Sequence, residues 1–225
     1  MNRATFAAVT LSIRPELETA HDRAWESLAS AGTWWSARQR RELAETAIAA
    51  MWSASADTDR RHHNDGEAAP AAAHSAVAVM ASGHPHITKQ WYQEVRDEIG
   101  VLEYVELVGL VCSVASLTSL RNTLGLPPRE LPTATDDGPS RVPAPPLADA
   151  TLNWVPVAAP ADADAAVVQA LTAVPAANEM LWSLADNQYI PDAEMVDPRW
   201  TRGTLSRVEM ELIATRVSFS RECHY

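Results

Sequence analysis

The sequence predicts an all-α protein, and three observations support this prediction. Ala is frequent in the 225 residues while Gly occurs only 8 times, and Ala costs no side-chain entropy in a helix. Long stretches repeat apolar residues at helical spacing. One of them, from Val101 to Leu124, is too long for an ordinary strand. Because 47% of the residues are hydrophobic, the chain can bury a sizeable core.

Two helices are expected near the start of the chain. From Glu16 to Ser30 the apolar residues fall on one stripe. A second helix is expected from Ser36 to about Ala54, because Ser36 and Gln39 stand at the spacing of a capping box. Residues 55 to 66 are polar and charged, so they are expected to form a loop.

Three further helices are expected in the middle of the chain. The first two run from Pro70 to Ser82 and from Ile87 to Ile99. The third, Val101 to Leu124, is apolar on several faces, which is typical of a buried central helix. Cys112 lies inside its apolar run, so it is expected to be a buried core residue.

A proline-rich segment divides the sequence into two parts. Seven prolines lie between Pro127 and Pro146, with few apolar residues at regular spacing. Such a segment is expected to be partly extended and to have no core of its own. The predicted organisation is therefore an N-terminal helical half (1–126), a linker (127–150) and a second half (151–225).

The second half is also expected to be helical. Two helices are predicted around Pro175, from Ala163 to Val174 and from Ala176 to Ala185. A loop with two prolines follows. The last helix is expected from Ser206 towards Arg221, and Ser206 and Glu209 form a second capping box at its start.

Charge and composition exclude several classes of function. The formal net charge of −11 repels phosphate backbones, so nucleic acid is not an expected partner. No stretch is expected to span a membrane, and residues 1–14 lack the features of a signal peptide. The two cysteines, Cys112 and Cys223, are far apart in the sequence, so no disulfide framework is indicated and the reducing cytoplasm is the expected location.

No metal or cofactor site is expected. The histidine pairs at His62 and His63 and at His84 and His86 lie in polar segments, without Cys or carboxylate ligands at a defining spacing. We therefore interpret these four residues as scattered surface histidines and not as metal ligands. A glycine-rich phosphate loop is also lacking.

The end of the chain carries the most informative pattern. The run SRVEMELIATRVSFSRECHY resembles the core motif of the alkylhydroperoxidase D and carboxymuconolactone decarboxylase family, in which a helix of the form S-R-x-x-x-E-L leads into a Cys-x-x-Cys pair and a later His. Glu211 lies twelve residues before Cys223, which matches the family spacing between the proton-relay Glu and the first Cys. The sequence ends at Tyr225, before the positions of the second Cys and the His.

The first half is similar to the same family in a degenerate form. The segments AHDRAWESLASAGTWWSARQRRELAE and ITKQWYQEVRDEIGVLEYVELVGLVCSVASLTSLRNTLGLP resemble stretches of longer, tandem members. Ala54 stands where this half would carry a Cys, so the half is expected to be structural. The resemblance implies an alkylhydroperoxidase D-like helical bundle that assembles into a homo-oligomer, since family members form trimers or larger rings.

The resemblance implies thiol-dependent reduction of a peroxide, with a dithiol reductant as the second partner. In that chemistry a thiolate becomes a sulfenic acid and a second thiol resolves it to a disulfide. Cys223 aligns with the resolving Cys and Glu211 with the relay. His224 is a further candidate, because an imidazole beside a thiol can act as a base. On this mapping the chain lacks the attacking thiol and should be weak or inactive as it stands.

The same residues fit other interpretations of the site and of the function. Cys223 can be an incidental thiol near the chain end, and Glu211 a solvated helix charge. A carboxymuconolactone decarboxylase-like enzyme does not need the Cys pair, and a non-catalytic helical scaffold could keep the same fold.

Overall fold

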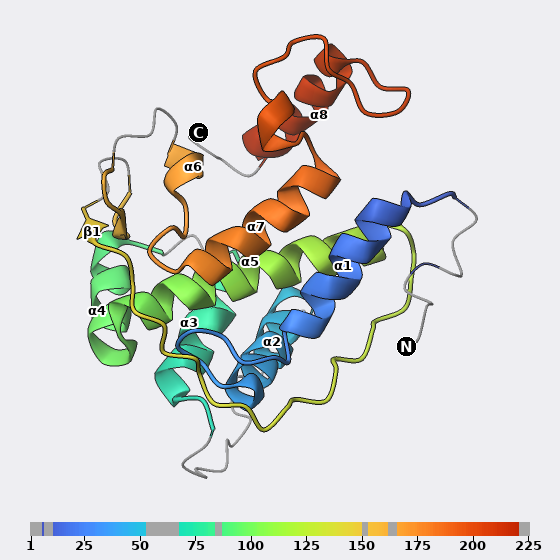
Figure 1. Ribbon diagram of the computed structural model, residues 1–225. Coiled ribbons are helices and arrows are strands. Elements are labelled where there is room, and N and C mark those ends of the chain that lie inside the picture. The colour runs from blue at the N-terminus through green and yellow to red at the C-terminus, as the bar shows by residue number, and fades with distance from the viewer. Residues whose placement is uncertain are drawn as a thin grey trace.

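The computed structural model describes residues 6, 11–52, 68–83, 87–149, 153–161 and 166–220. Within these residues the protein is mostly helical, as expected, with eight α-helices and one 3-10 turn (Figure 1). The described part contains a single two-stranded antiparallel ribbon, in which β1 (Leu147–Ala148) pairs with β2 (Val157–Ala158). The all-α prediction is therefore confirmed at the level of fold class.

The first two helices begin and end close to the predicted positions. Helix α1 spans Pro15–Ser27 and α2 spans Ala37–Trp52. The predicted capping box is formed, because the Ser36 N–H donates to Gln39 Oε1 at 3.0 Å and the Gln39 N–H donates to Ser36 Oγ at 3.2 Å. The loop predicted at residues 55–66 lies outside the described residues.

The middle of the chain forms the three predicted helices. Helix α3 spans Ala71–Ala81, α4 spans Lys89–Ile99 and α5 spans Val101–Thr123. Helix α5 contacts two groups of helices. One group is α1 and α7, and the other is α2, α3 and α4 (Figure 1). Eleven of its residues are buried, which confirms that it is the central helix.

By length and composition alone, α5 could cross a membrane, contrary to the expectation that no stretch could. Inside the fold most of its apolar side chains pack against five other helices, and it carries the buried Glu106. A helix that is hydrophobic on several faces is also what the centre of a helical bundle requires. Packing of α5 in this bundle therefore accounts for its composition.

The proline-rich segment contains no helix from Leu126 to Pro146, and it is tied to the bundle along its length. Its carbonyl groups accept hydrogen bonds from the Trp25 indole, through Glu130, and from the Arg41 guanidinium, through Pro132. The Ser140 N–H also donates to the Gly32 carbonyl at 2.9 Å. The segment is thus extended and bound to the surface of the helices, and it does not act as a flexible linker.

The helix predicted from Ala163 to Val174 is largely wrong. Residues 163–165 lie outside the described residues; from 166 to 174 only α6, Ala166–Gln169, is helical, and a turn leads into α7, Pro175–Gln188. Leu171 adopts a left-handed conformation with φ of 62°, which a continuing helix cannot accommodate. Burial explains the difference, since Leu171 and Val174 pack against Val105 of α5 in a small second core.

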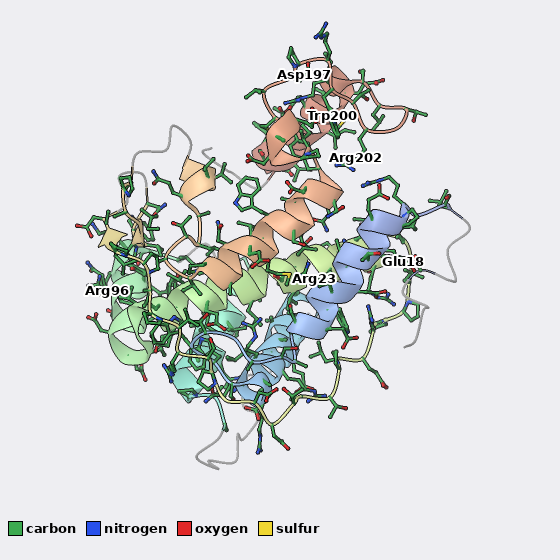
Figure 2. All side chains as sticks on the ribbon, in the orientation of Figure 1. Glu18, Arg23, Arg96, Asp197, Trp200 and Arg202 are labelled. Atoms are coloured by element: carbon green, nitrogen blue, oxygen red, sulfur yellow. The ribbon has the colours of Figure 1, made fainter. Side chains whose placement is uncertain are left out.

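The last part of the described chain stands apart from the bundle. After the 3-10 turn Asp192–Glu194, a loop leads to α8, Arg207–Ser220, and Figure 2 shows Asp197 and Trp200 of this loop away from the other helices, with Arg202 nearer the end of α7. Arg202 holds the loop to the end of α7, because its guanidinium donates to the carbonyls of Tyr189 and Asp186 at 2.8 and 2.6 Å. The second predicted capping box is present, with Ser206 N–H donating to Glu209 Oε2 at 2.7 Å.

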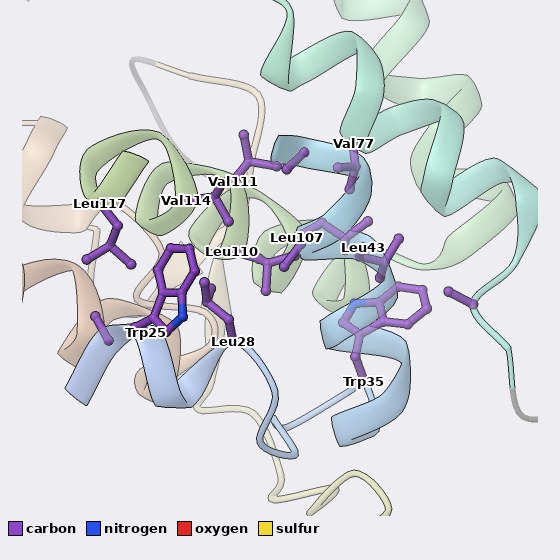
Figure 3. Packing of buried hydrophobic residues seen from close by; sticks show 14 of the residues in the cluster. Trp25, Leu28, Trp35, Leu43, Val77, Leu107, Leu110, Val111, Val114 and Leu117 are labelled. Carbon is purple, nitrogen blue, oxygen red and sulfur yellow. The ribbon is translucent and has the colours of Figure 1, made fainter. Parts of the chain in front are cut away.

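The main core lies where α1, α2, α3 and α5 meet (Figure 3). Trp25 comes from α1, Leu28 from the turn that ends it, Leu43 from α2 and Val77 from α3, and they surround the buried side of α5. The contributions of α5 are Leu107, Leu110, Val111, Val114 and Leu117. Leu184 of α7 joins the same cluster, so a helix from the predicted second half completes the core of the first.

Candidate functional site

Glu211 is the predicted site residue that the structure describes, and its carboxylate is held by two donors. The Tyr189 hydroxyl donates to Oε2 at 2.7 Å and Arg207 Nε donates to Oε1 at 2.7 Å. Arg207 also donates to the carbonyls of Asp197 and Met195, at 3.1 and 3.0 Å. The carboxylate is therefore fixed between the end of α7, the first turn of α8 and the loop that joins them.

The two donors determine the protonation state of this pair. The hydrogen bond from Tyr189 and, to a smaller extent, the bond and charge of Arg207 lower the pKa of Glu211 below its usual value. Burial first, and then the bond to Glu211, raise the pKa of Tyr189 to about 12. At neutral pH the glutamate is thus an ionised carboxylate, a weaker base than an unperturbed glutamate, and the tyrosine keeps its proton.

The other two predicted site residues, Cys223 and His224, lie outside the described residues. Within α8, nine residues lead from Glu211 to Ser220, which corresponds to a rise of about 14 Å along the helix axis. A relay between Glu211 and the Cys223 thiol therefore depends on the path of the chain after Ser220.

Cys112 is exposed, so the prediction that it is a buried core residue was wrong. It lies on α5 between Val111 and Ser113, both of which are buried, and one strip of the helix at Cys112 and Ser119 is left uncovered by the neighbouring helices. The thiol reaches solvent, but it lies among many protein atoms whose desolvating effect raises its pKa. A raised pKa keeps the thiol protonated and makes it a slow nucleophile.

A buried ion pair forms a second polar constellation, and the sequence reasoning missed it. Glu106 of α5 is only 2% exposed, and its Oε1 accepts from Arg40 Nη1 at 2.6 Å. Its Oε2 accepts from the Trp34 N–H at 2.7 Å. Arg40 also donates from Nη2 to the Ser27 carbonyl at 3.2 Å, so the pair joins α5, α2 and the end of α1.

Small residues leave a cavity beside this ion pair. Its volume is about 140 Å³, and Gly32, Gly109, Ser113 and Ala177 are among the residues that line it. Gly32 is required by the geometry, because a Cβ there would lie 1.8 Å from Glu106 Oε1. One signal in the sequence could have revealed the pair: Glu106 is a single acidic residue between Val105 and Leu107 in an apolar run, and a buried charge needs a partner.

His21 forms a third buried polar contact, between α1, α5 and α7. It is 2% exposed and its Nε2 lies 2.7 Å from Gln188 Nε2, while Gln188 also bonds Ser116. Burial lowers the pKa of His21 to about 4, and the positive charges of Arg121 and Arg129 act in the same direction while Asp22 opposes them. The imidazole is therefore neutral at pH 7 and serves the packing of three helices.

Among the described residues, no three or more His, Cys, Asp and Glu side chains are grouped so that they could hold a metal ion. The histidine pairs at positions 62–63 and 84–86 lie outside the described residues. Comparison of the chain with protein-family models, with curated proteins and with solved structures finds no match.

Proposed function

We propose that this protein reduces peroxides with a thiol, as proteins of the alkylhydroperoxidase D type do. Glu211 is the proton acceptor and Cys223 is a thiol of the redox pair. The observation that carries the proposal is the fixed, ionised carboxylate of Glu211, held by Tyr189 and Arg207 on the helix that leads to Cys223. The same two bonds lower the pKa of Glu211, so its contribution would come from its fixed position and not from high basicity.

The proposed chemistry assigns one role to each group. A thiol loses its proton to the Glu211 carboxylate, and the thiolate attacks one peroxide oxygen. The O–O bond breaks, the sulfur becomes a sulfenic acid, and the leaving oxygen takes up the proton as water or an alcohol. A second thiol then forms a disulfide with release of water, and a dithiol reductant restores both thiols.

The resemblance maps Cys223 to the resolving position, and we propose that its thiol can also take the attacking role; the disulfide step then needs another thiol. Cys112 lies on α5, and its raised pKa makes it a poor resolving thiol. We therefore expect one round of oxidation at Cys223 and little turnover, with a cytoplasmic dithiol as the reductant of the intact system.

The test compares peroxide oxidation of Cys223 in a Cys112→Ser background. Glu211→Gln should slow the oxidation of Cys223 by about 10²-fold or more at pH 7, which is the usual contribution of a positioned base. Glu179→Gln removes an exposed carboxylate from α7 and is the matched control, for which no change is expected. Equal rates for Glu211→Gln and the parent would reject the role of Glu211.

A non-catalytic assembly module is the second candidate, and one observation favours it. Helix α8 exposes several large apolar side chains, which is typical of a surface that another chain covers. Self-association of the chain is part of both proposals.

A further inference from the structure

Five large apolar side chains of α8 are exposed to solvent. Val208, Leu212 and Phe219 are 76%, 68% and 75% exposed, and Ile213 and Val217 are more than half exposed. A surface helix normally shows the opposite pattern, with charged residues outward and apolar residues towards the core. Figure 1 shows the helix at the edge of the molecule, where a partner has access.

Two charged groups of α8, Arg207 and Glu211, are on its inner side. Arg207 and Glu211 face the loop and Tyr189, and Met210 between them is the one buried residue of the helix. The contacts of Arg207 and Glu211 fix the rotation of α8, because turning its exposed apolar side chains inward would break these hydrogen bonds.

Two charges on the exposed face indicate what covers it. Glu209 and Arg216 are two turns apart and point in nearly the same direction around the helix. They stand at equal distances, about 5 Å along the axis, on either side of the midpoint between Leu212 and Ile213. A second copy of α8 that packs antiparallel about this midpoint brings Glu209 of each chain opposite Arg216 of the other.

The same pairing also matches the apolar residues. Leu212 meets Leu212 of the second copy at the centre, and Val208 of one chain lies beside Phe219 of the other. A parallel arrangement would instead place Glu209 against Glu209 and Arg216 against Arg216, which like-charge repulsion disfavours.

Both charged groups can take part without loss of their present contacts. The hydrogen bonds from Ser206 to Glu209 both use Oε2, at 2.7 and 2.8 Å, and Oε1 is the other acceptor of this carboxylate. The Arg216 guanidinium lies over the Phe219 ring at 5.6 Å, so it is already held on the exposed face.

We propose that α8 forms the interface of a two-fold symmetric dimer of this chain, through an antiparallel pair of α8 helices with two Glu209–Arg216 ion pairs across it. This inference rests on the self-association proposed above and is independent of the peroxide chemistry. Because the interface is isologous, each contact occurs twice, and a single substitution changes it in two places.

Charge reversal with complementation tests the arrangement, with sedimentation velocity as the measurement. Glu209→Lys and Arg216→Glu should each raise the dimer Kd by about tenfold or more, because each places two like-charge pairs across the interface. An equimolar mixture of the two variants restores both opposite-charge pairs and should return the Kd to near the parent value. Val196→Asp is the control, since Val196 is 89% exposed but lies outside α8, and its Kd should not change.

A second pair of variants guards against a folding defect, because Glu209 also caps α8. Leu212 is exposed and faces its own copy, so Leu212→Asp and Leu212→Lys should each dissociate the dimer and associate with one another when mixed.

Three results would overturn the inference. One is a parent chain that stays monomeric at about 100 µM, which would leave the face to a different protein or to a further segment of a longer chain. The second is a mixture that does not restore association. The third is a trimer or larger ring unaffected by the α8 variants, in which case self-association stands and this interface does not.

Discussion

Replacement of Glu106 by Gln tests whether the buried ion pair is a structural requirement of the fold. The carboxylate has two donors, the Trp34 N–H at 2.7 Å and Arg40 Nη1 at 2.6 Å, and each uses a different oxygen. A Gln side chain has one carbonyl oxygen, so its amide group must face one of these donors. The Arg40 guanidinium is 14% exposed and would lose the negative charge that compensates it.

The magnitude follows from the burial of the pair. Removal of one partner of a buried ion pair costs about 3–5 kcal/mol of unfolding free energy, because the remaining charge is left uncompensated. Glu106→Gln and Arg40→Met should each fall in that range. The double variant carries no charge at either position, and the carbonyl of the introduced amide can still accept from the Trp34 N–H, so its cost should be about 1–2 kcal/mol.

Urea unfolding of the four proteins measures the coupling between the two positions. The structure predicts a double variant that is more stable than either single variant, with a coupling of several kcal/mol. Additive effects of the two substitutions, or a loss of less than about 1 kcal/mol in Glu106→Gln, would refute the description of a desolvated pair.

Three further predictions concern other parts of the bundle. The pKa of His21 is about 4 in the folded protein, below the ordinary value of 6.5, so the unfolded chain binds a proton first as the pH falls. The contribution of His21 to stability should therefore be complete above pH 6.5 and decline by about 3 kcal/mol as the pH approaches 4. The measurement is the unfolding free energy as a function of pH between 6.5 and 4. His21→Gln should remove most of this pH dependence. Gly32→Ala should cost about 1–3 kcal/mol, since its Cβ would collide with the Glu106 carboxylate, whereas Gly138→Ala meets no atom within 4 Å and should be neutral. Thermal melting of both variants checks this, and equal melting temperatures would contradict it. Cys112 should react with a thiol reagent in the folded protein, because it is exposed, but more slowly than a free thiol, because its pKa is raised. A thiol at position 112 that labels only after unfolding would show that the strip of α5 around it is covered.

Local signals in the sequence predicted most of the helices. Helix α5 ends within one residue of its expected limits, and both capping boxes, at Ser36 and at Ser206, are formed as their spacing indicated. These features depend on neighbouring residues alone, which is why a single sequence is sufficient to predict them.

The errors concern features that depend on tertiary contacts. Cys112 and Val111 are adjacent in the same apolar run, and only the arrangement of the other helices decides that one is exposed and the other buried. Leu171 looks like a helix residue in the sequence, but its burial beside Val105 favours a turn. In the same way, the partners of Glu106 come from positions 34 and 40, more than 60 residues away in sequence.

The candidate site was predictable only in part. Glu211 was identified through a resemblance, and Arg207 stands four residues before it, a spacing at which charged side chains on a helix pair. The bond from Tyr189 could not be predicted, because it depends on how the loop between α7 and α8 folds. The roles of Cys223 and His224 stay predictions, since both lie outside the described residues.

Site-resolved oxidation by hydrogen peroxide tests the central claim most directly. Mass spectrometry of the protein after brief exposure at pH 7, with sulfenic acids trapped, gives separate rates for Cys223 and Cys112. The proposal predicts that Cys223 is oxidised about tenfold or more faster than Cys112, whose raised pKa keeps it protonated. Equal rates at the two cysteines, or a faster rate at Cys112, would contradict the assignment of Cys223 as a thiol of a peroxide-reducing site.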